Sequence, residues 1–536
     1  MKAVHFLCAS SLILFVLVGS CGPQGSGSSA DSGQEVGEAR YHETYRPQFH
    51  FSPDSMWMND PNGMVYYEGE YHLFYQHHPH SNVWGPMHWG HAISTDLVHW
   101  EHLPIALYPD SLGTIFSGSA VIDWKNSSGL GTSDQPPMVA IFTHHNQKLA
   151  ETGSEKFQYQ SIAYSLDKGR SWTKYPGNPV VKNPGIRDFR DPKVSWMEDA
   201  EKWIMTLAAH DRIMFYSSPD LINWSYESEF GANTGAHGGV WECPDLFPLE
   251  VNGEKKWVLL VSINPGGPNG GSATQYFVGE FDGSEFHNEN PGTEPLWLDY
   301  GKDNYAGVSW SDIPESDGRR LFLGWMSNWQ YANQVPTQRW RSAMTLPREL
   351  KLSENEKGYR LSSVPVEELK VLREERLELQ ADGNHRHDMG PKLGDNPPLF
   401  EMDLVFTYDP AKAQTEEEAL EFGITLKSDS DEFFIMGFNT REEQIFFGRQ
   451  ENSGKSDFSE HFSGVHAAPY QISEKGEIRF HAFIDLASVE LFVDDGAVVL
   501  TDIVFPEAGY QTLSWYRSDS TVNLKRGDIY RLKRSW

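Results

Sequence analysis

Three short motifs in this chain place a carboxylate close to a proline and beside an aromatic or basic residue. They are WMNDPNG (57–63), FRDP (189–192) and WECPD (241–245), and they present Asp60, Asp191 and Glu242. Three such carboxylates can supply a nucleophile, a proton donor and a negative group that stabilises an oxocarbenium-like transition state, as glycosyl transfer requires. For a single Asp-Pro, the ordinary alternative is a turn whose Asp only accepts hydrogen bonds from backbone N–H groups.

The first motif is expected to lie at the end of a strand. Pro61, Asn62 and Gly63 are turn-forming residues, and glycine tolerates the positive φ that a tight turn needs. This places Asp60 at the strand end, where its neighbours hold it. The motif is a catalytic candidate only if the fold brings the other two carboxylates to it.

The elements that would position these residues form a repeated pattern. The spacing S-x-D-x-x-x-W occurs at 94–100 and 218–224, 165–172 repeats it with one extra residue, and 281–286 resembles a fourth copy. The Asp of each copy is expected to bond the backbone of a hairpin turn. Recurrence at these intervals predicts propeller blades of roughly 40–50 residues, some with insertions. Each carboxylate precedes the turn of a different repeat, which predicts that all three line the central channel.

Composition favours an all-β protein with large cores. The chain has 536 residues, of which 39% are hydrophobic and 13% aromatic, and it contains 47 glycines. Its formal net charge is −31, from 44 Lys and Arg against 75 Asp and Glu, and this charge is spread along the sequence. Such a surface repels a phosphate backbone, so no nucleic-acid partner is expected. The many aromatic residues favour ligands with stackable faces, such as sugars.

From Arg46 onward the sequence consists of two β-rich regions. From Arg46 to Leu350, apolar and polar residues alternate with period two, turns are frequent, and no long helical periodicity occurs. A charged stretch (367–378) is either a short helix or an extended connector, and the alternating segments after 396 are typical of a β-sandwich. We expect a propeller catalytic domain over residues 43–352, a connector over 353–385, and a β-sandwich over 386–536 that supports the propeller or rims its mouth.

The N-terminus has the features of an export signal. Lys2 precedes an apolar run from Phe6 to Val18 that is too short to span a membrane, and V-G-S-C (18–21) resembles a lipobox. Residues 1–21 are therefore interpreted as a lipoprotein signal peptide with Cys21 as the lipidation site, and 22–42 as a flexible tether. An ordinary cleaved signal is the alternative. The interpretation predicts an exported bacterial lipoprotein, periplasmic or at the cell surface, that contacts the membrane only through its lipid anchor.

The cysteines and a group of histidines are the remaining residues of the sequence with reactive side chains. With Cys21 lipidated, Cys243 is the one cysteine left in the mature chain, so no intramolecular disulfide is expected, and it is interpreted as a packed residue rather than a nucleophile. Several histidines lie near 77–91, but neither an accompanying cysteine nor a helical H-E-x-x-H motif is present. They are interpreted as structural or rim residues, and the sequence predicts neither a metal nor another cofactor.

The three motifs resemble the signature boxes of glycoside hydrolase family 32, the β-fructofuranosidases that include levanases, inulinases and invertases. Further matches occur at 74–76, 83–86, 116–119, 324–329 and 336–350, and in the second region at 488–492. The resemblance covers nearly all of the mature chain. It implies an all-β fold in which a five-bladed β-propeller is followed by a β-sandwich, in agreement with the repeat.

The resemblance also implies roles for individual residues. Asp60 would be the nucleophile, Glu242 the general acid and base, and Asp191 the stabiliser of the transition state. Arg190 would contact the sugar, although it could instead serve only as an ion-pair partner for a nearby acid. The residues implied to line the subsite for the terminal fructosyl unit are Asn59, Gln76, Trp84, Ser117, Arg190 and Trp329.

These roles predict retaining hydrolysis of β-D-fructofuranosyl linkages in fructans such as levan or inulin, and also in sucrose. Exo action is favoured because Trp84 and Trp329 resemble the walls of a closed terminal subsite. Both β-2,6 and β-2,1 linkages stay open, as does the oligomeric state. The alternatives are a fructosyltransferase on the same scaffold, a non-catalytic fructan-binding lipoprotein, and a propeller glycosidase of a related pentose-cleaving family.

Overall fold

The structure is a computed structural model that describes residues 41–132, 134–290, 292, 294–379, 399–414 and 419–536. Within these residues the chain forms seven β-sheets and few helical turns. The helical elements are α1 (Gln147–Glu151), α2 (Pro410–Ala413) and the 3-10 turns η1 (Glu198–Ala200) and η2 (Glu367–Leu372). In the described part of the chain no helix is long and apolar enough to cross a membrane. The predicted signal peptide, Cys21 and nearly all of the predicted tether lie outside the described residues.

Five sheets follow one another along the first part of the chain. The first is β1 (Met56–Tyr67), β2 (Glu70–His78), β3 (His88–Ser94) and β4 (Trp100–Leu107), joined by β20 (Trp340–Arg341). The second is β5 (Thr114–Ile122), β6 (Met138–His145), β7 (Gln158–Ser165) and β8 (Thr173–Lys174), and the third is β9 (Phe189–Met197), β10 (Lys202–Ala209), β11 (Ile213–Ser218) and β12 (Ser225–Phe230). The fourth is β13 (Val240–Val251), β14 (Glu254–Asn264), β15 (Ala273–Phe281), β16 (Phe286–Asn288) and β17 (Leu296–Trp297). The fifth is β18 (Tyr305–Ser309), β19 (Arg320–Met326), β21 (Ala343–Met344), β22 (Arg348–Asn355) and β23 (Gly358–Pro365).

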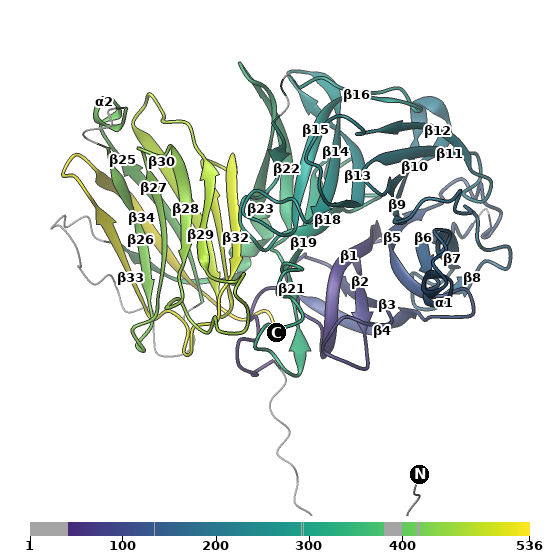
Figure 1. The fold of residues 1–536 in the computed structure, drawn as a ribbon, viewed down its shortest axis with the longest axis horizontal. Helices are drawn as coiled ribbons and strands as arrows, with labels where there is room; N and C mark the ends of the chain where they lie inside the picture. Colours follow the sequence, from purple (N-terminus) through teal and green to yellow (C-terminus); the bar gives the residue numbers. More distant parts are fainter. Residues whose placement is uncertain (1–40, 133, 291, 293, 380–398, 415–418) are drawn as a thin grey trace, which may run out of the picture. The chain divides into compact units, whose positions relative to one another are not determined.

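The first strands of these five sheets form a closed ring. Strand β1 contacts β5, β5 contacts β9, β9 contacts β13, β13 contacts β18, and β18 contacts β1 again. In Figure 1 these strands surround the centre of the five sheets, with the later strands of each sheet farther out. Apolar side chains of neighbouring sheets interlock, as where Val139 and Ile141 of β6 meet Val194 of β9. The predicted five-bladed propeller is therefore confirmed.

The repeated turn occupies the same place in four blades. In each it joins the third strand to the fourth, so 94–100 links β3 to β4 and 218–225 links β11 to β12. Oδ1 of Asp96 accepts hydrogen bonds from the backbone N–H of Val98 (2.9 Å) and His99 (2.8 Å), and Asp220 and Asp282 bond their own turns in the same way. The expected Asp-to-backbone bonding is thus observed, because a short carboxylate satisfies N–H groups that the turn leaves without strand partners.

Two further sheets form a β-sandwich. One consists of β24 (Arg373–Glu378), β34 (Asn523–Leu532), β25 (Phe400–Thr407), β30 (Glu477–Asp485), β31 (Ser488–Val493) and β32 (Val498–Ile503). The other consists of β29 (Gly464–Pro469), β28 (Gln444–Arg449), β27 (Phe433–Asn439), β26 (Glu421–Lys427) and β33 (Thr512–Arg517). Alternate residues of the two sheets share one core, as period-two patterning requires. The charged stretch becomes η2 and then β24, and the fifth propeller sheet continues to Pro365, beyond the boundary expected at 352.

A buried network of charges joins propeller residues to the sandwich. The Arg348 guanidinium donates to Asp299 Oδ2 (2.9 Å) and to Glu490 Oε2 (2.5 Å). His50 lies between two sandwich carboxylates, with Nδ1 2.8 Å from Asp485 and Nε2 2.9 Å from Glu490. All five side chains are almost fully buried. Separating the sandwich from the propeller would leave these charges without partners. The network therefore stabilises the contact between the two domains.

We expect His50 to make folding stability fall at alkaline pH. Burial by itself lowers the pKa of His50, but the hydrogen bonds and charges of Asp485 and Glu490 outweigh it and raise the pKa from 6.5 to about 9. A raised folded-state pKa gives stability that is complete below the unfolded value and is lost as pH rises from 6.5 to about 9. The loss should be on the order of 3 kcal/mol.

Urea unfolding at several pH values across that window measures this loss. His50→Gln should be less stable than the parent at the acidic end and should show a smaller decrease across the window. His461→Gln, at an exposed histidine of the sandwich, is the matched control and should keep the parent's decrease. An unchanged pH slope in His50→Gln would contradict the assignment.

Candidate active site

All five inner strands carry an irregularity at the same level of the channel. The pairing of each inner strand with the second strand of its blade slips between Met58 and Pro61, Ile115 and Gly118, Arg190 and Lys193, Glu242 and Asp245, and Tyr305 and Val308. Such β-bulges turn side chains in new directions and leave backbone positions without ladder bonds. Proline is tolerated there because no N–H is required, which explains the prolines in the three motifs.

The expected strand end at Pro61, Asn62 and Gly63 was wrong. Strand β1 continues to Tyr67, and the three residues are accommodated by register shifts on both sides of Pro61 and Asn62. Gly63 does adopt a positive φ of 58°, and a Cβ there would lie 2.7 Å from the rings of Phe74 and Trp89. The glycine is therefore required by close packing inside a bulged strand rather than by a turn.

Asp60 lies in the channel with both carboxylate oxygens bonded. Oδ1 accepts from Asn59 Nδ2 (3.0 Å), whose own Oδ1 accepts from Trp57 Nε1 (2.7 Å), and Oδ2 accepts from Ser117 Oγ (2.7 Å). Burial raises the pKa of Asp60, the bond from Ser117 opposes that shift, and the charge of Glu242 adds to it. Residues of two blades thus fix the orientation of this carboxylate.

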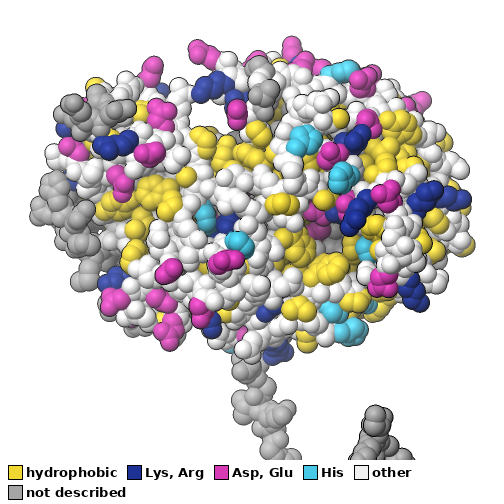
Figure 2. Space-filling model, in the orientation of Figure 1, with side chains coloured by type: hydrophobic (Ala, Val, Ile, Leu, Met, Phe, Trp, Pro, Cys, Tyr) yellow, Lys and Arg dark blue, Asp and Glu magenta, His cyan; other side chains and the backbone are white. Residues whose placement is uncertain are grey.

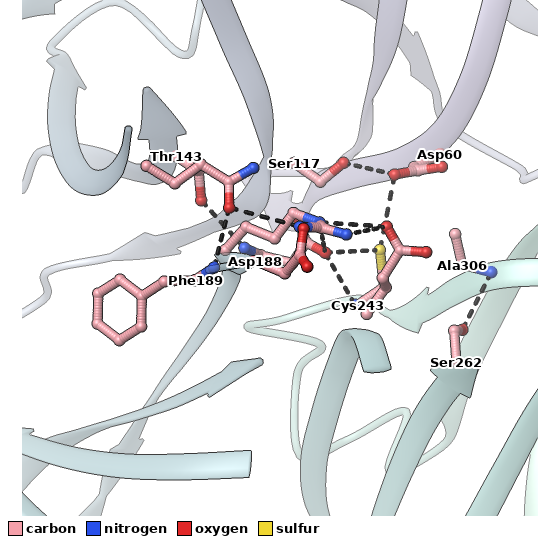
Figure 3. A network of polar contacts seen from close by, with 12 residues as sticks. Asp60, Ser117, Thr143, Asp188, Phe189, Cys243, Ser262 and Ala306 are labelled. Atoms are coloured by element: carbon pink, nitrogen blue, oxygen red, sulfur yellow. Dashed lines mark hydrogen bonds and ion pairs between the residues drawn. The ribbon is translucent and has the colours of Figure 1, made fainter. Parts of the chain in front are cut away.

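The Cys243 side chain lies beside Asp60 (Figure 3) and also contacts Asp191. The Cys243 thiol is 3.6 Å from Asp60 Oδ2 and 3.7 Å from Asp191 Oδ2, and its backbone N–H donates to Asp191 Oδ2 (3.1 Å). Burial raises the pKa of Asp191 to about 7; the charge of Arg190 opposes this, whereas Glu242 and Asp60 add to it. Burial also raises the pKa of the Cys243 thiol well above its usual value, so the thiol stays protonated and packed, as predicted.

Glu242 is held from two sides. Arg190 donates to Oε1 through Nε (3.1 Å) and Nη2 (3.0 Å), and the Tyr305 hydroxyl donates to Oε2. Arg190 also donates from Nη1 to Asp188 Oδ1 (2.7 Å). The ion-pair role considered for Arg190 is therefore real, and the guanidinium also lines the pocket.

Two of these contacts were not predicted from the sequence. Asp188 lies two residues before Arg190 with a positive φ of 58°, which separates it from the strand pattern of β9. Tyr305 begins the inner strand of the fifth blade, the one blade that carries neither a carboxylate motif nor a copy of the turn repeat. The aromatic side chain of Tyr305 is the one local signal in the sequence, and no motif accompanies it.

One cavity of about 560 Å³ opens at this end of the channel. Figure 2 shows a hollow over the middle of the five blades with acidic side chains at its base. Trp84 is 42% exposed, and Trp329 stacks on Trp57 with ring centroids 5.9 Å apart. The structure brings every predicted catalytic and substrate-binding residue to this cavity, namely Asn59, Asp60, Gln76, Trp84, Ser117, Arg190, Asp191, Glu242 and Trp329.

The segment after β6 forms a wall that was not predicted. Helix α1 and the residues that follow it contribute Gln147, Ala150, Ser154 and Glu155 to the lining. Asn146 caps the N-terminus of this helix, because its side chain accepts a hydrogen bond from the Leu149 N–H (3.0 Å). The fold of blade two brings this segment to the cavity, and its sequence carries no motif that indicates this position.

The histidines near the first motif form hydrogen bonds with the backbone and with one another. His77 Nδ1 bonds the Trp57 carbonyl (2.8 Å), and His72 Nδ1 lies 3.0 Å from His91 Nε2. Burial lowers the pKa of His72 and of His77 to about 4. No group of three or more His, Cys, Asp or Glu side chains within the described ranges is arranged to hold a metal ion.

Fold and site together define a class of all-β protein in which a five-bladed propeller with three carboxylates in its channel precedes a β-sandwich. The model of the glycosyl hydrolases family 32 N-terminal domain matches residues 50–365, and that of the family 32 C-terminal domain matches residues 368–531. The chain belongs to glycosyl hydrolase family 32.

Particular relatives extend over both domains. A levanase of Bacillus subtilis (strain 168) is 50% identical over 514 residues, which cover 95% of this chain and 73% of that protein. An extracellular exo-inulinase of Aspergillus awamori is 37% identical over 92% of this chain and 96% of its own length. A crystal structure of exo-inulinase from the same species superposes with a TM-score of 0.83 at 36% identity, over 92% of this chain and 100% of that one. A β-fructofuranosidase structure from Schwanniomyces occidentalis, complexed with fructosyl-erythritol, gives a TM-score of 0.81 at 31% identity, covering 92% and 99% of the two chains.

Proposed function

We propose that this chain hydrolyses β-D-fructofuranosyl linkages of fructans such as levan or inulin, and of sucrose, with retention of configuration. The observation that carries the proposal is the meeting of Asp60, Asp191 and Glu242 in one cavity, each on the inner strand of a different blade. The relatives named levanase and exo-inulinase support the same class of substrate. A retaining glycosidase needs a nucleophile and a separate proton donor on opposite sides of the scissile bond.

In the first step Asp60 attacks the anomeric carbon of the terminal fructosyl unit. Glu242 gives its proton to the departing oxygen, so the glycosidic bond breaks as the ester bond to Asp60 forms. In the second step Glu242 takes a proton from water, which attacks the same carbon and releases Asp60. The bonds from Asn59 and Ser117 keep the Asp60 carboxylate in position through both steps.

The remaining groups orient the sugar and the acid. Asp191 accepts hydrogen bonds from fructosyl hydroxyl groups and stabilises the positive charge of the oxocarbenium-like transition state. Arg190 and Tyr305 hold the Glu242 carboxyl from either side, which fixes where its proton is delivered. The amide groups of Asn59 and Gln76 suit ring hydroxyls.

The size and lining of the cavity support exo action. Trp84 and Trp329 contribute aromatic side chains to the lining, and residues of α1 and the loop after it contribute to the wall. A volume of about 560 Å³ is that of a small-ligand pocket, which supports binding of a chain end.

The proposal also includes the location of the enzyme, which rests on the N-terminal residues. Export as a lipoprotein, with Cys21 as the lipid attachment site and the following residues as a tether, would hold the enzyme at a membrane facing external fructans. Export agrees with the relative described as extracellular. The catalytic domain in this proposal is the propeller, and the sandwich supports it through the buried network around Arg348.

Products formed at the earliest times test the reaction. With levan, inulin and sucrose as separate substrates, we expect fructose as the first product from each polymer, and NMR should detect the β-anomer before mutarotation. A ladder of oligomers would contradict exo action, and the α-anomer appearing first would contradict retention. Oligosaccharides that accumulate at high sucrose instead of fructose would favour a transferase.

A further inference from the structure

A second cavity of about 540 Å³ lies at the other ends of the same inner strands. In β9, Arg190 and Asp191 line the first cavity, whereas Lys193 and the residues after Val194 line the second. In β13, Glu242 lines the first cavity and 245–248 line the second. The two cavities therefore lie at different levels of the propeller, and they share no lining residue.

The walls of this distal cavity are rich in tryptophan. Trp124, Trp196, Trp203 and Trp257 all contribute to the lining. Trp124 is 59% exposed, and its Nε1 donates to Asp312 Oδ1 (2.8 Å), which fixes the orientation of the ring. An exposed tryptophan held in one orientation is a preformed apolar face, because little side-chain entropy is lost when a ligand covers it.

Unused hydrogen-bonding groups line the same cavity. Asp245 is fully buried; its Oδ2 accepts from the Ser309 N–H (2.6 Å) and lies 3.5 Å from Lys193 Nζ, but its Oδ1 has no hydrogen-bond partner among the described residues. The Arg320 guanidinium lies over the Phe247 ring, 4.8 Å from its centroid, and the hydrogen bonds from its Nη1 are long, to Ser309 Oγ (3.5 Å) and to the Trp310 carbonyl (3.4 Å). A buried carboxylate oxygen without a donor costs about 1–3 kcal/mol, so a ligand that donates to it would recover that energy.

We propose that the distal cavity is a second carbohydrate-binding site that holds a segment of the fructan chain. A hydroxyl group can donate to Asp245 and accept from Arg320. The basic side chains of the lining are matched by acidic ones, which favours a neutral ligand over an anion: Lys125, Lys193, Lys255 and Arg320 stand against Glu198, Asp199, Asp245 and Asp312. The net charge of −31 also disfavours an anionic ligand. Tryptophan faces beside adjacent donors and acceptors suit a neutral ring with several hydroxyl groups.

Fructan as the occupant rests on the proposed function, since the substrate is the polyhydroxyl ligand that this enzyme meets. A chain held at the distal end would keep the polymer near the enzyme while the terminal unit is cleaved at the other end. The site would therefore affect long substrates and leave sucrose hydrolysis unchanged.

Trp124→Ala tests the apolar wall and Arg320→Met tests the polar end. Tyr226→Ala, at a tyrosine of β12 that is 51% exposed and does not line the cavity, is the matched control. Each full-length protein is run in native gels containing levan, inulin or dextran, and kcat/KM is measured on levan, inulin and sucrose. Both test variants should lose retardation in the fructan gels and show kcat/KM on at least one fructan about 3- to 10-fold lower. Sucrose hydrolysis should not change.

Each other outcome is decisive. Parent-like retardation and parent-like kcat/KM on both fructans in the two test variants would overturn the site. An equal loss on sucrose and polymer would also overturn it, because a structural effect on the propeller would then suffice. Equal retardation of the parent by dextran and by fructan would overturn fructan as the occupant. If the parent hydrolyses neither fructan nor sucrose, the proposed function fails, whereas the gels still report whether the distal cavity binds fructan.

Discussion

Asp60→Asn is expected to lower kcat for fructan hydrolysis by at least about 10⁴-fold, because an uncharged amide cannot attack the anomeric carbon to form the ester. The substitution keeps the size of the side chain, so Ser117 Oγ still has an acceptor if the amide oxygen faces it. Substrate binding should be nearly intact, since the other lining residues are unchanged. The measurements are initial fructose release from levan and inulin, and calorimetric titration with sucrose, which in the proposal above binds only at the active site.

Asp457→Asn, at an exposed aspartate of the sandwich, is the matched control and should keep parent activity. Thermal unfolding of Asp60→Asn should remain cooperative, because the lost charge lies in a site where burial disfavours it. Turnover within about ten-fold of the parent would exclude Asp60 as the nucleophile. Loss of activity together with loss of folding would call for Asp60→Ser as the second variant, which must then show the same kinetic loss in a folded protein.

Glu242→Gln is expected to lower kcat by about 10²- to 10⁴-fold on fructans, because both the departing oxygen and the incoming water lose their proton carrier. The amide preserves the volume between Arg190 and Tyr305, although it replaces one acceptor with a donor. An aryl fructoside with a good leaving group should recover much of the first step, since that oxygen needs no proton. The measurement compares kcat/KM on the aryl fructoside with that on sucrose.

Azide separates the two roles of Glu242. It needs no general base, so it should accelerate turnover of the aryl fructoside by Glu242→Gln and yield fructosyl azide with retained configuration. The same anion should not rescue Asp60→Asn through a retained product, because no ester is formed there. Glu460→Gln, at an exposed glutamate of the sandwich, is the control variant. Equal losses on activated and natural substrates, without azide rescue, would contradict the acid and base assignment.

The carboxylates of the candidate site were predictable because each one belongs to a short local motif. Asp60, Asp191 and Glu242 stand in short stretches with proline and aromatic neighbours, and the turn repeat indicated that they belong to different blades. The contacts that hold them were not predictable in the same way. Tyr305 contacts Glu242 across 63 positions of sequence, and nothing near either residue indicates the pairing.

The bulges are a second case in which residue types were informative but the tertiary structure was needed to interpret them. Proline in the three motifs indicated an irregular backbone, and it was interpreted as a strand end at Pro61. A turn and a bulge use the same residue types, because both need positions without a ladder N–H and with positive φ. Only pairing with the second strand distinguishes them, and β2 continues to pair with β1 on both sides of the slip.

By itself, the sequence determined the all-β class, the blade repeat and the identity of the three carboxylates, because period-two alternation, turn chemistry and motif composition are properties of neighbouring residues. Tertiary structure decided which groups orient those carboxylates, how Arg348 and His50 join the sandwich to the propeller, and that a tryptophan-lined cavity faces away from the active site. These features depend on closing a ring of five blades, which brings together side chains that no local pattern relates. Trp57 to Gly63 could thus be recognised in the sequence, but its place in the middle of a bulged strand became known only from that closure.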